Sequence, residues 1–253
     1  MNKIYWDGDM DVGLEDLSNL LVKISAEFRS NAIKCAKYSY DPKIQELITE
    51  ESMNRFEAIV GCLSSDLKEI FYYTTDDIDS ISVGESLGLK MKDWIMLGSA
   101  VEAILQIFLS VYLTDYQSSN WNQWISFNVD NAKKPIFEVI DKLVNDNVIE
   151  SPQGKSLKEA IKKKIKEHTK LKSVDKVMLN DLILFFDNNN ILDEDDVTCL
   201  RDIQNNRNCV HAYSNRNIGT WEDLKYCIRF FCYLMEVFIG QFPDLDHIDL
   251  SEW

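Results

Sequence analysis

The stretch WIMLGSAVEAILQIFLSVYL, residues 94–113, is apolar on nearly every side of a helix and decides the fold of this chain. Twenty such residues are long enough to span a bilayer. However, Glu102 lies in the middle of the stretch, where a charge costs roughly 2.5 to 3.5 kcal/mol on insertion scales. We therefore interpret the segment from about Met91 to Asp115 as the central helix of a soluble bundle, with a membrane span as the alternative.

The composition agrees with a helical fold. The chain has 253 residues, enough for one large domain or two small ones, and it is 45% hydrophobic, which argues against disorder. Nine Gly and four Pro are too few for the turns that sandwiches, barrels and doubly wound sheets require. We expect an all-α helical bundle.

The flanking segments predict further helices. Apolar residues at three-and-four spacing predict a helical hairpin over residues 14–73, with a break near Ser52. We expect this hairpin to occupy residues 1–86, where it packs on the core or dimerises, and the main bundle to occupy residues 87–253. Additional helices are expected at residues 132–149, 177–189 and 221–241, with SPQG (residues 151–154) as a break.

Several kinds of site lack sequence support. The chain contains no GxxxxGK[ST], GxGxxG or GxSxG motif, so P-loop, Rossmann and serine-hydrolase chemistry are not indicated. Its six cysteines form no CxxC and have no metal-ligand spacing with the three histidines. The acidic run from Asp193 to Asp196 is interpreted as a helix cap. We expect no metal, no cofactor and, from a first segment without an export signal, a cytoplasmic protein.

Charge is distributed unevenly along the chain. With 27 Lys and Arg against 42 Asp and Glu, the net charge is −15, which is acidic for a nucleic-acid binder. Residues 155–176 nevertheless hold nine lysines against three acids, a local charge of +6, which leaves −21 for the rest. This segment is either a solvated helix face or a surface for a polyanion. If RNA is the substrate, Lys162, Lys163 and Lys166 are the expected contacts.

One motif supports chemistry, the segment LRDIQNNRNCVHAY at residues 200–213. If it is helical, Arg207, Asn208 and His211 project from one face. Arg offers fixed donors to a phosphate or its pentacoordinate transition state, and His exchanges protons near neutral pH. That pairing suits metal-free RNA cleavage, in which the 2′-hydroxyl attacks the adjacent phosphate. The alternative is an Arg and a His that tie down a helix end.

The same residues resemble a known family. The core RN-x-V-H, the preceding IQNN, the following Ala212-Tyr213 and the later IGTWEDL are similar to the signature region of HEPN-domain proteins. The stretch at 94–113, with Gly98 and Glu102, is similar to the first core helix of that family. The resemblance covers about Trp94 to Phe242 and leaves out the N-terminal hairpin. Three residues separate Arg207 from His211, where the family pattern usually has four to six.

The resemblance implies a helical bundle and a function. HEPN proteins are often metal-independent endoribonucleases of toxin–antitoxin or phage-defence systems, and dimers juxtapose two motifs, while other members are non-catalytic. By this resemblance His211 transfers protons, Arg207 stabilises the phosphorane, and Asn208 and Glu102 orient them. Tyr213 matches a tyrosine that is nucleotidylated in some family toxins. We expect an RNA substrate, a homodimer and an antitoxin or defence-system partner, or alternatively a non-catalytic binding or regulatory module that acts through a protein partner.

Overall fold

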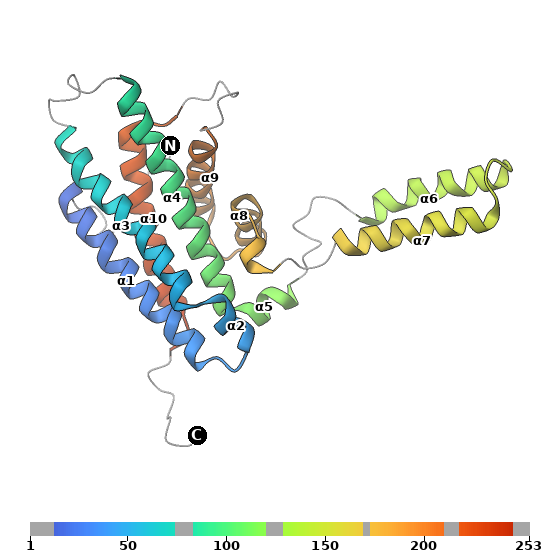
Figure 1. Cartoon of the computed structure of the whole chain (residues 1–253), viewed down its shortest axis with the longest axis horizontal. Coiled ribbons are helices and arrows are strands. Elements are labelled where there is room, and N and C mark those ends of the chain that lie inside the picture. The colour runs from blue at the N-terminus through green and yellow to red at the C-terminus, as the bar shows by residue number, and fades with distance from the viewer. Residues whose placement is uncertain (1–12, 74–82, 120–128, 169–172, 210–217, 245–253) are drawn as a thin grey trace, which may run out of the picture. The chain divides into compact units, whose positions relative to one another are not determined.

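The computed structural model describes residues 13–73, 83–119, 129–168, 173–209 and 218–244, and within these ranges every regular element is a helix (Figure 1). In chain order they are α1 (Leu14–Tyr38), α2 (Pro42–Leu47), α3 (Glu50–Tyr73), α4 (Val83–Val111), α5 (Leu113–Ser118), α6 (Val129–Asn145), α7 (Ser151–His168), the 3₁₀-helix η3 (Val174–Lys176), α8 (Leu179–Asn188), α9 (Glu194–Asn208) and α10 (Trp221–Gln241). The expected all-α fold class is confirmed.

The chain forms two compact units, one of residues 1–113 with 177–253 and one of residues 114–176. This division differs from the expected boundary between residues 86 and 87. The reason is that α1 and α3, the two long helices of the N-terminal hairpin, pack on α4 and α10 inside the larger unit. The helical hairpin that stands as a unit of its own is the one formed by α6 and α7.

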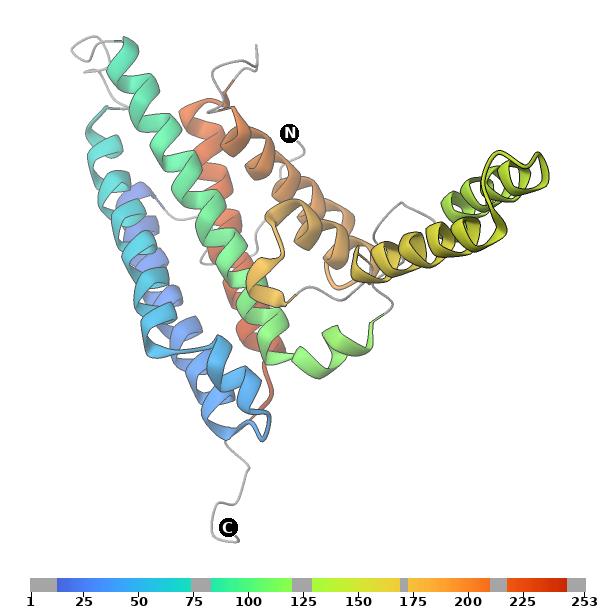
Figure 2. The same cartoon turned by 45° about the vertical axis from the view of Figure 1, so that its right-hand side comes forward.

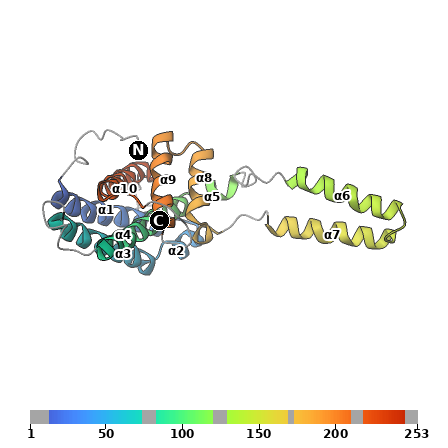
Figure 3. The same ribbon diagram turned by 90° about the horizontal axis from the view of Figure 1, so that it is seen from above.

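Helix α4 is the centre of the larger unit. It packs against α1, α2, α3, α8, α9 and α10, and Figures 2 and 3 show α8 and α9 on the side of α4 away from α1 and α3. Its side chains Trp94, Leu97, Val101, Ile104 and Leu105 have no exposed surface. Although α4 is long and apolar enough to cross a membrane, 61% of its most apolar window is buried by the rest of the chain. This burial is typical of a core helix in a soluble protein.

Aromatic rings connect the N-terminal hairpin with the core. Phe28 of α1 lies 5.8 Å from Phe56 of α3 and 5.4 Å from Phe242, which directly follows α10. Phe108 of α4 stacks on Phe238 of α10 with ring centroids 4.3 Å apart and also lies within 6.1 Å of Phe242. These contacts combine large apolar burial with offset ring packing, so the hairpin shares one hydrophobic core with α4 and α10.

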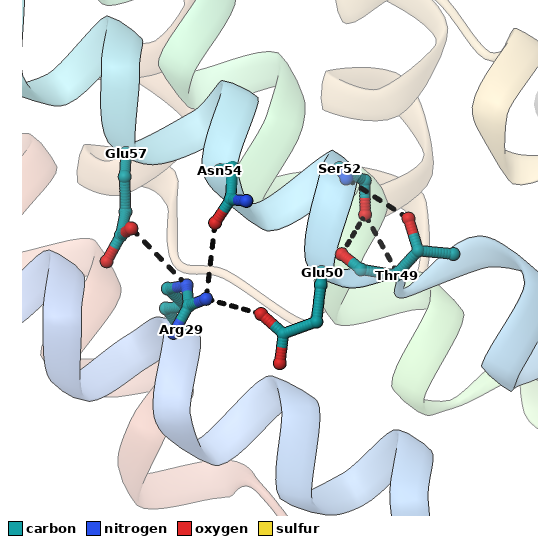
Figure 4. A network of polar contacts seen from close by, with 6 residues as sticks. All are labelled: Arg29, Thr49, Glu50, Ser52, Asn54 and Glu57. Atoms are coloured by element: carbon teal, nitrogen blue, oxygen red, sulfur yellow. Dashed lines mark hydrogen bonds and ion pairs between the residues drawn. The ribbon is translucent and has the colours of Figure 1, made fainter.

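Polar contacts fix α1 against α3. In the buried part of their interface, the Ser18 and Ser64 hydroxyls lie 2.7 Å apart, because serine is small enough to let the backbones approach. Nearer solvent, the Arg29 guanidinium on α1 contacts three α3 side chains, Glu50, Asn54 and Glu57 (Figure 4). The two helices are therefore joined by apolar packing at the centre and by charge at the edge.

The break in the predicted hairpin lies slightly earlier than Ser52. Helix α2 ends at Leu47, and Thr49 then caps α3: its hydroxyl accepts from the Ser52 N–H at 3.1 Å, while its own N–H donates to the Ser52 hydroxyl at 2.9 Å (Figure 4). Ser52 is thus part of the capping arrangement that starts α3, and the break itself falls at Ile48 and Thr49.

Two helix boundaries differ from the prediction. Helix α4 begins at Val83, well before Met91, because its first turns are largely exposed and carry no apolar periodicity for the sequence pattern to reveal. The segment SPQG does not break the chain but opens α7. Pro152 is the second residue of that helix, where a missing N–H costs nothing, and the buried Gly154 leaves room for Val144 of α6.

The start of α9 confirms the capping interpretation of the acidic run. The Asp193 carboxylate accepts from the Asp196 backbone N–H at 2.8 Å. Asp196 itself is only 5% exposed. Burial, followed by the negative charges of Asp193 and Asp195, raises its pKa from 3.8 to about 6, although the nearby Asp193 backbone N–H lowers it. From α10, Tyr233 faces the same charges, and its pKa is raised by burial and then by Asp196 and Asp193.

Replacing Asp196 by Asn should stabilise the protein in a pH-dependent way. The folded carboxyl has the higher pKa, so the wild type loses stability as pH rises from about 4 to about 6 and bears the full penalty above that. At pH 7.5 we expect Asp196→Asn to raise the free energy of unfolding by about 1–3 kcal/mol, and near pH 4 by much less. Urea denaturation at both pH values measures the difference.

The exposed neighbour provides the control for this prediction. Asp195→Asn removes the same charge from the same helical turn and should change stability by less than about 0.5 kcal/mol at either pH. A pH-independent effect of Asp196→Asn, or equal effects of the two variants, would show that burial of the Asp196 charge does not destabilise the fold.

Candidate functional site

Arg207 lies in the last turn of α9 and is held by α4. Its Nη1 donates to Oε2 of Glu102 at 2.6 Å, and the Arg207 and Glu102 side chains are 26% and 17% exposed. The structure thus brings together two of the predicted site residues that are 105 positions apart in sequence. A half-buried ion pair of this kind fixes the plane of the guanidinium more firmly than a surface pair does.

Gly98 makes this arrangement possible. It lies one helical turn before Glu102 on α4, and the aliphatic stem of Arg207 passes directly over it. A Cβ atom at position 98 would lie 2.5 Å from Cδ of Arg207 and 3.1 Å from its Cγ. Because any side chain here would displace Arg207, the absence of a Cβ is what lets the guanidinium reach Glu102.

Most N–H donors of the Arg207 guanidinium have no hydrogen-bond partner among the described residues. Of its five N–H donors, only one on Nη1 has a hydrogen-bond partner among the described residues, namely Glu102. The exposed quarter of the side chain leaves the others within reach of solvent. An oriented arginine with unused donors is suited to bind a phosphate or another oxyanion.

Asn206 connects the end of α9 to the start of α10. Its Oδ1 accepts from the Gly219 backbone N–H at 2.7 Å, and its Nδ2 donates to the Asp202 carbonyl at 2.9 Å. Gly219 is followed by Thr220, which with Asp223 forms the capping box of α10. The two ends of the segment between these helices are thereby held together beside Arg207. In the sequence Asn206 is only the last residue of the IQNN stretch, and nothing there reveals this contact, whose partner lies 13 residues away.

Of the remaining motif residues, the structure describes only Asn208. Asn208 is the last residue of α9, half-buried, and its side chain makes no hydrogen bond to a described residue. It follows Arg207 directly, so the two side chains diverge by about 100° around the helix. The helix that should present three motif residues on one face ends here, with Cys209 as its C-cap. His211 and Tyr213 lie outside the described residues.

The lysine segment belongs to the other compact unit. Lys162 and Lys163 are exposed on α7, and Lys162 pairs with Glu159 at 2.7 Å. That hydrogen bond and the charge of Lys162 lower the pKa of the Glu159 carboxyl. The third predicted contact, Lys166, lies in the same helix, but its side chain lies outside the described residues.

The thiols do not suggest a second site. Cys35, Cys199, Cys227 and Cys232 are buried, Cys62 is exposed and Cys209 is half-buried. Burial raises the pKa of Cys35 and that of Cys199 to about 11, which makes them poor nucleophiles. Within the described ranges, no group of three or more His, Cys, Asp or Glu side chains is arranged to hold a metal ion.

Comparison of the chain with protein-family models, with curated proteins and with solved structures gives no match in any of the three.

Two Gly→Ala substitutions should have opposite effects on stability. Gly98→Ala places a methyl group against the Arg207 stem, and we expect it to lower the free energy of unfolding by about 1–3 kcal/mol. Gly61→Ala lies in α3 with no atom within 4 Å of the new Cβ, so the better helix propensity of Ala should raise stability by about 0.5–1 kcal/mol. Urea denaturation of both variants measures the two effects.

A second measurement separates the loss of the ion pair from general overpacking. A double-mutant cycle with Glu102→Gln and Arg207→Lys gives the coupling between these side chains, and the same cycle in the Gly98→Ala background should give a smaller one. If Gly98→Ala raised stability as Gly61→Ala does, or left the coupling unchanged, the contact between Gly98 and the Arg207 stem would not position the guanidinium.

Proposed function

We propose that this protein is a metal-independent endoribonuclease of the toxin or phage-defence type, in which Arg207 and His211 act on RNA. The observation that supports the proposal most is the Arg207 guanidinium, which Glu102 holds and most of whose donors have no partner among the described residues. His211 follows Arg207 by four positions in the sequence. The resemblance of this region to HEPN proteins also supports the proposal, because members of that family often cleave RNA with such residues. Neither a metal nor a cofactor takes part.

The chemistry assigns a role to each residue. The 2′-hydroxyl of RNA attacks the adjacent phosphorus while His211 takes its proton. The bond from phosphorus to the 5′-oxygen then breaks as the protonated His211 returns that proton to the leaving oxygen. Arg207 donates to the nonbridging oxygens, where negative charge accumulates in the phosphorane. Glu102 keeps the guanidinium in place, and Asn208 adds a neutral donor. The products are a 2′,3′-cyclic phosphate and a 5′-hydroxyl.

The proposal includes assembly and control. Two protomers would bring two copies of the motif together in one composite site. An antitoxin or another defence-system protein would hold the activity in check, and nucleotidylation of Tyr213 would have the same effect, because it adds bulk and negative charge two residues from His211.

Charge favours a second candidate, a non-catalytic binding or regulatory module. Outside residues 155–176 the chain carries a net charge of −21, which repels RNA and suits a basic protein partner. In that case the pairing of Arg207 with Glu102 has a structural purpose only. The two candidates differ in what happens to RNA when Arg207 or His211 is changed.

Substitution of the motif should abolish cleavage without unfolding the protein. With purified protein, single-stranded RNA and excess chelator, we expect Arg207→Ala and His211→Ala to lower the cleavage rate at least about 100-fold. The matched control is Arg201→Ala, on the same helix, where the guanidinium contacts only Asn180 and Gln204 among the described residues. The control should cleave at nearly the wild-type rate. On expression, the wild type and Arg201→Ala should arrest growth, whereas Arg207→Ala and His211→Ala should not.

Two results would contradict the ribonuclease proposal. If the wild type and His211→Ala are equally harmless on expression and equally inert toward RNA in chelator, the binding-module candidate replaces it. A monomer whose mass by light scattering does not change with concentration, and which still cleaves RNA, would remove the composite dimeric site but leave the chemistry.

The lysines of α7 should control RNA affinity rather than chemistry. We expect Lys162, Lys163 and Lys166 changed together to Gln to weaken RNA binding and to flatten its dependence on salt, by nearly one unit of log–log slope for each phosphate that is no longer neutralised. The cleavage rate at saturating RNA should change much less. Filter binding across a salt series measures the slope.

A variant with the same change in charge provides the control. Lys23, Lys34 and Lys68 are exposed on α1 and α3, and their joint replacement by Gln removes three positive charges from the other compact unit. If both triple variants changed the slope equally, net charge alone would explain the effect. An unchanged slope in the α7 variant would mean that RNA does not bind along these lysines.

A further inference from the structure

The hairpin of α6 and α7 has almost no hydrophobic core of its own. Its two helices, of 17 and 18 residues, lie side by side (Figure 3). Of the residues in these helices that the structure describes, only Ile140 and Gly154 are buried. A chain of this size usually needs a disulfide, a metal or another subunit to stay folded, because two helices alone bury too little apolar surface. The hairpin therefore requires a further surface to cover it.

Large apolar side chains are exposed on both helices of the hairpin. On α6, Ile136 and Val139 are 44% and 58% exposed, and the half-buried Leu143 continues their row at a spacing of three and four residues. On α7, Leu157 is 46% exposed. We name these four side chains the apolar face.

The ion pair between Asp141 and Lys158 shows that the apolar residues of the two helices lie on the same side of the hairpin. Its N and O atoms are 2.6 Å apart, so it joins α6 to α7 on one side of their line of contact. On α6, the buried Ile140 separates Val139 from Asp141. On α7, Leu157 lies about 100° back around the helix from Lys158. The apolar rows of both helices are therefore on the side away from the ion pair.

The larger unit has no apolar surface of this kind among its described residues. Its exposed large apolar side chains are spread over α1, the link from α1 to α2, α4 and the residue before α8, as Val22, Tyr40, Leu87, Ile95 and Met178. Residues 129–168 hold nine lysines and seven acids, a net charge of +2, which leaves −17 for the rest of the chain. Apolar side chains are covered best by other apolar side chains. The surface of this chain that best matches the apolar face is therefore the same face of a second copy.

The hairpin is large enough to form a dimer through this face. Helices of this length are about 25 Å long and pack about 10 Å apart, so the two together present about 500 Å² in each copy. Two such faces bury about 1,000 Å², which is the lower limit for a specific interface. We propose that the apolar faces of two copies pack together and form a four-helix bundle. Lys162, one turn after Lys158, is on the side of the ion pair and stays outside this bundle, so the proposal does not depend on the ribonuclease chemistry.

Hydrogen exchange of the full chain, measured by mass spectrometry at about 1 μM and about 100 μM protein, reads the hairpin separately from the other helices. An interface of this size is expected to have a dissociation constant in the micromolar range. Because a second copy stabilises the hairpin by mass action, the amides of α6 and α7 should exchange at least about fivefold more slowly at the higher concentration. Sedimentation velocity over the same range should show the monomer becoming a dimer.

Charged substitutions on the apolar face complete the test. Val139→Glu on α6 and Leu157→Glu on α7 should each weaken the dimer at least about tenfold and remove the concentration dependence of exchange, with the helical content by circular dichroism unchanged. The matched control is Val22→Glu on α1, where the valine is 48% exposed, and it should behave as the wild type.

Three results would overturn the proposal. Exchange of α6 and α7 that does not depend on protein concentration would mean that no second copy covers the hairpin. A dimer that forms without slower exchange in these two helices would have its contact elsewhere. Equal effects of Val139→Glu and Val22→Glu would show that added charge, and not the apolar face, controls association. None of these measurements uses RNA, so each outcome is independent of the ribonuclease proposal.

Discussion

The burial of α4 is the constraint on which the rest of this structure depends. A helix that is apolar nearly all round cannot face water, and six other helices of the chain cover it. Its few small or polar positions then let specific side chains of the covering helices approach it closely. Gly98 and Glu102 are two of these positions, and both contact Arg207. The same requirement that builds the core thus fixes the guanidinium at its edge.

Much of the fold could be predicted because it follows local rules. Helix α10 begins and ends at the expected residues, since Thr220 and Asp223 form a capping box and the apolar pattern continues to Gln241. The predicted start of α4 is too late, because the first turns of this helix are exposed and carry no pattern. The compact units do not divide at residue 86 for a different reason: the ring contact of Phe28 with Phe242 depends on tertiary structure, which hydrophobic periodicity does not reveal.

The site could be predicted in part. Glu102 and Arg207 follow from their similarity to a family pattern, and the structure joins them in an ion pair. The contact of Asn206 and the burial of Asp196 could not be predicted. The first depends on a backbone N–H thirteen residues away, and the second on residues of α8 and α10 that lie around the start of α9. An exposed capping carboxylate and a buried one look alike in a one-dimensional sequence, because only the surrounding helices decide how much of the charge reaches solvent.

The packing of α1 on α10 has a consequence for biosynthesis. A ribosome delivers α1 well before α10, so the apolar face of α1 that contacts α10 stays uncovered until α10 has been synthesised. Non-local contacts of this kind slow folding and expose the nascent chain to chaperones. The Arg207 site is also assembled late, because α4 must wait for α9. A nascent chain that ends before α9 therefore has neither a closed core nor the ion pair between Arg207 and Glu102.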